Sequence, residues 1–123
     1  MKDLNDPECP FCQRILSKDY MRTNGLVVVF KPLRPVIPGH LLAVPVIHVE
    51  HALADPSVAG ITMSYAAEVA AETGLAYNLI TSAGHRASQT VFHLHVHLVP
   101  RRLGDGLVLP WTAQQAGQPR DPA

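Results

Sequence analysis

The sequence predicts a single globular domain in which a β-sheet packs against one long helix. Its 123 residues suffice for one hydrophobic core, and 47% of them are hydrophobic against 16% charged. Apolar residues alternate strictly with three histidines over 91–99, and period-2 alternation of this length indicates a strand. Over 57–73, apolar residues recur instead at the helical spacings of three and four: Val58, Ile61, Tyr65 and Val69.

A hairpin is predicted in the first third of the chain. Asn24-Gly25 is a turn dipeptide, and the β-branched run 26–30 that follows it indicates a strand. Residues 21–23 are expected to form the short partner strand. Three prolines and a glycine then make 31–39 a loop.

A short helix and a further strand flank this hairpin. The helix is expected over 12–18, with Ile15 and Leu16 facing inward. The apolar run 41–44 is stopped by Pro45, which indicates a short buried strand.

The long helix has recognisable signals at both ends. Asp55 is placed to cap its N-terminus, and Gly74 is a natural C-terminal stop. We expect this helix to cover one face of the sheet. Residues 75–81 indicate another strand, and the histidine-bearing strand is expected to end at Pro100, because proline cannot donate to a ladder.

The C-terminal part of the chain carries a short apolar segment, 107–111. It ends at Trp111, the only tryptophan, which we expect to be buried against the domain or a second subunit. The tail that follows is polar and contains prolines, as disordered segments do. The predicted division is one domain over 1–111 and a disordered tail over 112–123.

Composition argues against several classes of partner. Ten basic and ten acidic residues give a formal net charge of zero, so nothing suggests a nucleic-acid or membrane surface driven by charge. No stretch of about 18 apolar residues is present, and the N-terminus lacks the apolar run of a signal peptide. We therefore expect a cytoplasmic protein that binds neither membranes nor nucleic acid.

The two cysteines, Cys9 and Cys12, form a CxxC motif. In a reducing compartment such a motif is half of a metal site, a free dithiol or a redox pair. The redox interpretation requires a strand just before the motif, and only eight residues precede Cys9. Seven histidines elsewhere favour a Cys2His2 zinc site.

Three histidines on one strand face, His93, His95 and His97, are costly to bury without polar partners. On a regular strand the outer two would lie about 13 Å apart, too far to share one metal ion. We therefore expect a histidine at one end of this row to bind a metal ion and the others to face a substrate.

Further polar residues precede these histidines. His40 and His48 bracket the 41–44 strand, whereas His51 has no such context and is expected on the surface. The loop 82–90 is rich in small residues, which let backbone amides approach a ligand closely. Gln89 and Thr90 add side-chain donors, so this loop suits phosphate oxygens, although an ordinary hairpin loop would have a similar composition.

These motifs resemble the histidine triad (HIT) family of nucleotide hydrolases and transferases. The resemblance rests on His-Leu-His-Val-His at 93–97, on Ser-Gln-Thr-Val at 88–91 and on Pro-Gly-His at 38–40 with His48 downstream. It covers about residues 9–111. It implies an α+β fold with a five-stranded antiparallel sheet, one long and one short helix, and a homodimer with a continuous ten-stranded sheet.

The resemblance also implies a mechanism and its residues. His95 would attack the α-phosphorus of a nucleoside 5′-phosphate conjugate, such as an adenosine phosphoramidate or a dinucleoside polyphosphate, and form a covalent nucleotidyl-histidine that water hydrolyses. The remaining roles are implied for residues that match the family's positions. His97 and His40 would neutralise or protonate phosphate oxygens, Gln89 and Thr90 would hold them, Phe30, Leu33 and Leu42 would form the base pocket, and Cys9, Cys12, His48 and His93 would bind a structural zinc ion.

Two positions depart from the family pattern. Pro32 stands where many members have an aspartate for the ribose hydroxyls, and Ser82 stands where an asparagine is common. An alternative function is therefore a nucleotide-binding, zinc-stabilised interaction protein with vestigial activity. A hydrolase that uses zinc-bound water is disfavoured, because a closed Cys2His2 site has no open position for water.

Overall fold

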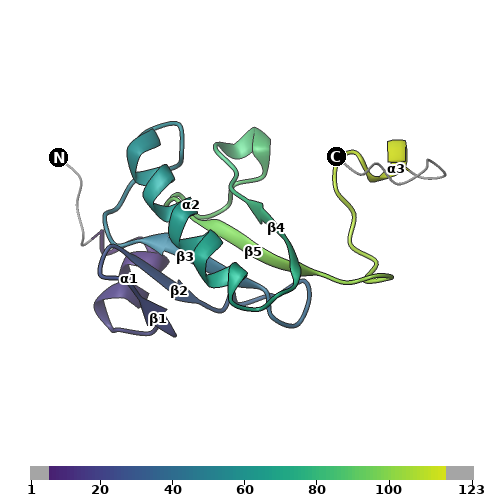
Figure 1. Cartoon of the computed structure of the whole chain (residues 1–123). Coiled ribbons are helices and arrows are strands. Elements are labelled where there is room, and N and C mark those ends of the chain that lie inside the picture. Colours follow the sequence, from purple (N-terminus) through teal and green to yellow (C-terminus); the bar gives the residue numbers. More distant parts are fainter. Residues whose placement is uncertain (1–5, 116–123) are drawn as a thin grey trace.

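The computed structural model describes residues 6–115 of the chain (Figure 1). Besides a 3₁₀ turn at His85–Ala87, the elements follow in the order α1 (Pro10–Leu16), β1 (Arg22–Thr23), β2 (Val27–Phe30), β3 (Leu41–Pro45), α2 (Pro56–Ala71), β4 (Ala76–Ile80), β5 (Val96–Arg101) and α3 (Thr112–Gln115).

The five strands form one sheet in the order β1-β2-β3-β5-β4, and every neighbouring pair is antiparallel. This confirms the predicted α+β fold with a five-stranded antiparallel sheet. The sheet places β5 in its interior, between β3 and β4, and leaves β1 and β4 as the two edge strands.

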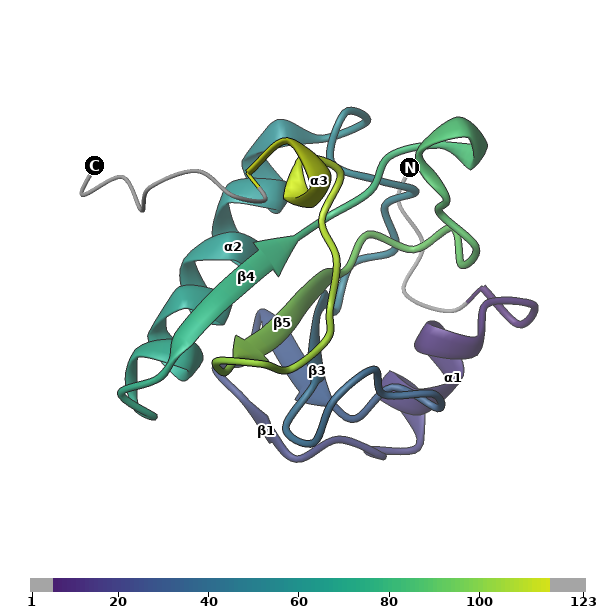
Figure 2. The same ribbon diagram turned by 90° about the vertical axis from the view of Figure 1, so that its right-hand side faces the viewer.

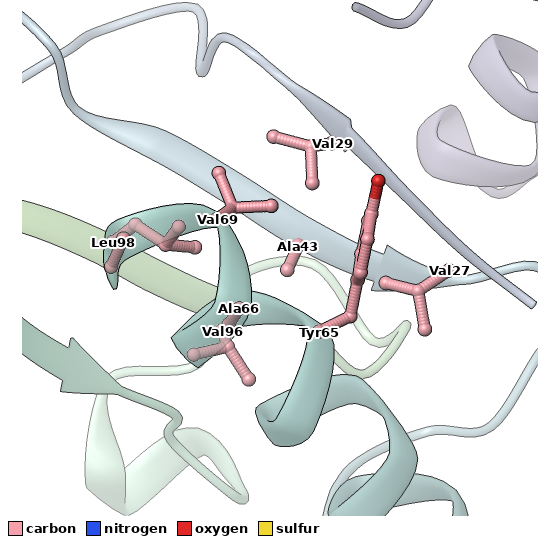
Figure 3. Close-up of a cluster of buried hydrophobic side chains, with 9 residues drawn as sticks. Val27, Val29, Ala43, Tyr65, Ala66, Val69, Val96 and Leu98 are labelled. Carbon is pink, nitrogen blue, oxygen red and sulfur yellow. The ribbon is translucent and has the colours of Figure 1, made fainter. Parts of the chain in front are cut away.

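Helix α2 packs along one face of this sheet (Figure 1). Its N-terminus is capped as predicted, because the Asp55 side chain accepts a hydrogen bond from the Val58 amide at 3.1 Å. The side chains that meet in this layer come from α2 and from alternate positions of three strands (Figure 3). They are Val27, Val29, Ala43, Tyr65, Ala66, Val69, Ala70, Val96 and Leu98.

Two members of the predicted helical stripe, Val58 and Ile61, are not in this core. Ile61 is 44% exposed, whereas Thr62 is fully buried and donates its hydroxyl to the Val58 carbonyl at 2.8 Å. Small residues such as Ala66 and Ala70 face the sheet and let the helix approach it closely. Because alanines contribute to the buried face of α2, the large apolar residues alone did not predict which side of the helix faces the sheet.

Helix α1 covers part of the opposite sheet face. Its buried residues are Phe11 and Cys12, which pack on Val28 and Phe30 of β2. The prediction that Leu16 faces inward was wrong, because the helix ends at this residue and its side chain is 52% exposed.

The histidine-bearing strand is shorter and shifted relative to the prediction. Residues 91–95 are irregular and β5 begins at Val96, so only His97 of the three histidines lies on a strand. Pro100 does not end the strand, which continues to Arg101. Strand β3 pairs with β5 only as far as Leu98, so at Pro100 the strand has one neighbour, as at a sheet edge, and tolerates proline.

After β5 the chain leaves the sheet as an arm that carries α3 (Figures 1 and 2). Trp111 is 47% exposed, so it is not buried against its own domain. The range predicted as a disordered tail begins with the short helix α3, and residues 116–123 lie outside the described residues. None of the helices within residues 6–115 is long and apolar enough to cross a membrane.

Candidate functional site

Two histidines from separate segments meet on the sheet face opposite α2. His97 projects from β5, where it pairs with Leu42, and His40 comes from the loop that leads into β3. His40 Nε2 and His97 Nδ1 are 2.9 Å apart, which is a hydrogen-bond distance. The structure thus brings together two of the histidines that the sequence predicted to act on substrate.

The hydrogen-bond partners assign the tautomers of this pair. The Val36 amide donates to His40 Nδ1 at 3.1 Å, so the proton of a neutral His40 is on Nε2. His40 then donates to His97 Nδ1, which leaves the His97 proton on Nε2. The Nε2–H group of His97 is therefore a donor that His40 does not use.

His95 is oriented by the backbone. Its Nδ1 donates to the His93 carbonyl at 2.8 Å, which leaves Nε2 with an unshared electron pair. Thr81 Oγ1 donates to the His95 carbonyl at 2.7 Å and fixes the main chain at this point. The His95 and His97 rings lie 5.1 Å apart between centroids, so the free nitrogen and the N–H donor belong to adjacent groups.

Burial keeps these rings neutral at neutral pH. Desolvation lowers the pKa of His40 and of His95, and it lowers the pKa of His97 to about 4, with smaller contributions from the neighbouring His95 and His40. A neutral imidazole is the nucleophilic form, so the cluster is suited to attack an electrophile near pH 7.

This burial predicts a pH dependence of stability. Below pH 6.5 the unfolded state protonates His97 while the folded state does not until about pH 4, so the free energy of unfolding must fall as the pH falls through this window. We expect His97→Gln to remove about 1–2 kcal/mol of the decrease between pH 7.5 and pH 5. Urea unfolding of both proteins at the two pH values measures this, and equal decreases would contradict it.

A pocket of about 290 Å³ lies beside His40 and His97. It is bounded by β4, β5, the loop before β3 and the C-terminal arm. Its lining consists of Val36, His40, Asn78, Ile80, Ser82, Ser88, His97, Val99, Arg101 and Leu107–Leu109. Of the residues predicted from the sequence, His40, His97 and Ser82 share this pocket.

Arg101 is the cation of this pocket, and its donors are already engaged. It makes two hydrogen bonds to the Asp105 carboxylate at 2.8 and 3.0 Å, one to Asn78 at 2.6 Å and one to the Leu107 carbonyl at 3.1 Å. The Arg101 guanidinium holds the pKa of Asp105 well below its usual range. Arg101 therefore fixes the start of the arm against the pocket.

A second cluster, distinct from this pocket, unites Cys9, Cys12, His48 and His93. One ligand atom from each lies within 4.8 Å of the others. Sulfur-to-nitrogen distances are 3.3 Å for Cys9 and His93, 3.3 Å for Cys12 and His48, and 3.5 Å for Cys12 and His93. A tetrahedral zinc ion with ordinary bond lengths places such atoms roughly 3.5 Å apart, so the four residues fit a metal ion.

The protonation chemistry of this cluster also fits a metal. His93 Nε2 donates to the Pro45 carbonyl at 2.8 Å, which turns the lone pair of Nδ1 toward the sulfurs. Burial lowers the pKa of His93 to about 4, so the ring is neutral at pH 7. Burial raises the pKa of the Cys12 thiol to about 11, so only a cation would make it a thiolate here.

The predicted base-pocket residues lie in different environments. Phe30 and Leu42 are buried in the hydrophobic cluster under α1, where Phe11 meets Phe30 edge-on at 5.3 Å between centroids. The Arg14 guanidinium lies 3.8 Å from the Phe30 ring centre. Leu33 is 95% exposed on the loop after β2. The structure therefore does not bring these three side chains together around one cavity.

The side-chain amide of Gln89 makes its hydrogen bonds to main-chain groups. Its Nε2 donates to the Glu50 carbonyl at 2.7 Å and the Val91 carbonyl at 3.0 Å, and its Oε1 accepts from the Gly84 amide at 2.8 Å. The side chain thus braces the 82–90 loop. Thr90 is exposed on the other side of the loop and lines a cleft next to Cys9 and His48.

Several pocket residues were not found from the sequence. Asn78 and Ile80 alternate on β4, so a strand at 75–81 with one face toward the histidines would have indicated them. Arg101 and the 107–109 part of the arm had no such signal, because their position depends on the turn that Asp105 makes. His51 was expected on the surface, but it is half-buried and its Nδ1 is enclosed.

The fold and the site define an α+β protein with a histidine-lined pocket and a separate Cys2His2 cluster. The model of the HIT domain matches residues 15–104, and the chain belongs to this family. The resemblance inferred from the motifs is thereby confirmed. Cys9 and Cys12 precede the matched range, so the metal cluster extends beyond what the family match covers.

Known relatives agree with this assignment. Protein HitA of Neisseria gonorrhoeae is 32% identical over 101 residues, which cover 74% of this chain and 94% of that protein. The purine nucleoside phosphoramidase of Escherichia coli is 28% identical over 97 residues, 73% of this chain and 82% of that enzyme. The structure of a HIT family hydrolase from Clostridium thermocellum aligns with a TM-score of 0.70 at 28% identity, over 85% of this chain and all of that chain.

Proposed function

We propose that this protein cleaves nucleoside 5′-phosphate conjugates at the α-phosphate through a covalent nucleotidyl-histidine on His95. The observation that carries the proposal is the orientation of His95. Its Nδ1 is committed to the His93 carbonyl, which leaves Nε2 as the free nitrogen, and its ring lies beside that of His97 in the His97–His40 pair. The similarity to an Escherichia coli purine nucleoside phosphoramidase supports a phosphoramidate or a related conjugate as substrate class.

In the proposed first step His95 Nε2 attacks the α-phosphorus. A nitrogen–phosphorus bond forms, the bond to the leaving group breaks, and the leaving group departs with the electron pair of that bond. The hydrogen bond from Nδ1 to the His93 carbonyl stabilises the positive charge that develops on the ring. Water then attacks the same phosphorus and gives up a proton, which replaces the one taken by the leaving group. The nitrogen–phosphorus bond breaks and its electron pair returns to His95, which is released neutral together with the nucleoside monophosphate.

His97 and His40 are proposed to handle charge and protons on the phosphate. His97 presents its Nε2–H to an oxygen of the phosphate or to the leaving group, and His40 holds it in that tautomer. Ser82 and Ser88 line the same pocket and offer hydroxyl groups. A direct role of Gln89 on the phosphate would require its side chain to leave three backbone partners.

The metal cluster is proposed to bind zinc in a structural role. Two thiolates and two imidazoles close a tetrahedral site, which leaves no position for a reactive water. The ion would tie the segment before α1 to the irregular segment that carries His93 and His95. It would thereby set the main-chain position of the nucleophile.

A homodimer is also proposed. Strand β4 is an edge of the sheet, and the arm beyond β5 exposes apolar side chains such as Val108 and Trp111. Pairing two β4 edges would produce the continuous ten-stranded sheet implied by the family, and a partner would cover the arm. Light scattering at micromolar concentration is expected to report a dimer, and a monomer there would contradict the proposal.

Ribose discrimination is expected to be weak. Pro32 stands where many family members have an aspartate and has no group that can pair with the 2′-hydroxyl. Ribo and 2′-deoxyribo forms of one substrate should therefore have similar values of kcat/KM. A preference for ribose above about 100-fold, or roughly 2.7 kcal/mol, would mean that another group recognises this hydroxyl.

A substrate panel tests the proposed activity. Adenosine and guanosine 5′-conjugates with amine, sulfate, amino-acid and nucleotide leaving groups are incubated with the protein, and the products are identified. The proposal requires a nucleoside 5′-monophosphate as the common product. Cleavage at any phosphate other than the α-phosphate would contradict it.

A further inference from the structure

The two histidines of the metal cluster differ in how their outer nitrogens are held. Both face the sulfurs through Nδ1, so the Nε2–H of each requires an acceptor that fixes the ring and its tautomer. For His93 this acceptor is the Pro45 carbonyl at 2.8 Å. For His48, Nε2 faces Oδ2 of Asp6 at 3.9 Å.

Asp6 is held in place by its own turn. Its Oδ1 accepts from the Glu8 amide at 3.0 Å, and its carbonyl accepts from the Cys9 amide at 3.1 Å. One carboxylate oxygen is therefore fixed at the start of α1, and the other is directed at His48. The same turn leads directly into the first cysteine of the cluster.

From this arrangement we propose that Asp6 is a positioning residue of the metal site. Its carboxylate accepts the Nε2–H of His48, keeps the lone pair of Nδ1 directed at the metal, and raises the basicity of the ring. The inference rests on the metal site proposed above, and it assigns a function to a residue that neither the CxxC motif nor the histidine row indicated.

The separation of 3.9 Å is longer than a direct hydrogen bond. Asp6 and His48 line a cleft of about 250 Å³, which gives the carboxylate space to rotate toward the ring or to hold a bridging water. Both arrangements place a negative acceptor on the outer side of His48. The carboxylate is partly exposed, so its effect should be seen in metal affinity more than in the stability of the fold.

The test compares Asp6→Asn with Glu8→Gln. Asparagine keeps an oxygen that accepts from the Glu8 amide, so it preserves the turn, but it replaces the charged acceptor oxygen facing His48 with an NH2 group. Glu8 is an exposed carboxylate on the same cleft, so its substitution is a matched control for general electrostatics. Zinc affinity is measured by competition with a chromophoric chelator. Asp6→Asn should weaken binding by about 10- to 100-fold, and Glu8→Gln by less than about twofold.

A second background shows whether Asp6 acts through His48. His48→Cys keeps four ligands, because Cys3His is also a closed zinc site, but it has no N–H for the carboxylate. Asp6→Asn should cost no affinity in this background. Equal losses in both backgrounds, or equal effects of Asp6→Asn and Glu8→Gln, would overturn the role of Asp6. Failure of the unaltered protein to bind zinc would overturn the metal site as well.

Discussion

His95→Asn is expected to reduce turnover by at least about 10⁴-fold while the protein stays folded and keeps its metal. No neighbouring group can replace the attacking nitrogen, because His97 Nδ1 is occupied by His40 and its Nε2 carries a proton. An asparagine amide can still donate to the His93 carbonyl, so the irregular segment before β5 should keep its conformation.

The matched control is His85→Asn, which changes an exposed histidine in the adjacent loop. Steady-state kinetics, metal content and thermal melting are measured on both variants. His85→Asn should retain activity and one zinc ion per chain. Loss of zinc from His95→Asn would contradict the assignment of His93, and not His95, to the metal site.

The second large effect is expected from the metal ligands. Cys9→Ser and His48→Ala should each release the zinc ion, because a tetrahedral site that loses one of four protein ligands binds far more weakly. Metal binding is part of the folding free energy, so the melting temperature should fall. A loss of only about 3 kcal/mol lowers the melting temperature of a domain of this size by more than about 10 °C.

Metal content by elemental analysis and melting with and without chelator measure this effect. The chelator should lower the melting temperature of the unaltered protein toward that of Cys9→Ser and should not change the variant further. His85→Asn again provides the control. Retention of zinc by Cys9→Ser would contradict the cluster as the zinc site.

Periodicity in the sequence was sufficient to predict most of the sheet and the long helix. The strands at 27–30, 41–45 and 76–80 and the cap at Asp55 follow from local rules, and local rules were enough because these segments are apolar runs bounded by turn residues. The α+β fold was predicted from motifs that resemble a family, and the matched HIT domain confirms that inference.

The start of β5 could not be predicted because it depends on pairing with distant residues. Strand β3 ends at Pro45, which has no amide to continue the ladder beyond Ala43 and Val96. The Leu94 amide donates instead to the Val49 carbonyl at 2.6 Å, and His93 turns into the metal cluster. The alternation of apolar residues and histidines therefore begins at residue 91, five residues before the first residue of β5.

The histidine and cysteine positions were more predictable than the pocket around them. Both clusters consist of residue types with few other uses at such density. The separation of His93 from His97 was predicted from a regular strand, but it arises because residues 91–95 are irregular and His93 turns into the metal cluster. The contacts of Asp6, Gln89 and Arg101 depend on turns and loop packing that no local pattern encodes.

The most direct test of the central claim is detection of the covalent intermediate. The protein is mixed with a nucleoside 5′-phosphoramidate, quenched on the millisecond scale and examined by intact-mass spectrometry, with peptide mapping of any adduct. We expect one nucleotidyl group per active chain, attached to His95 and absent from His95→Asn. Turnover without an adduct on His95, or nucleotide binding with neither adduct nor turnover, would contradict it.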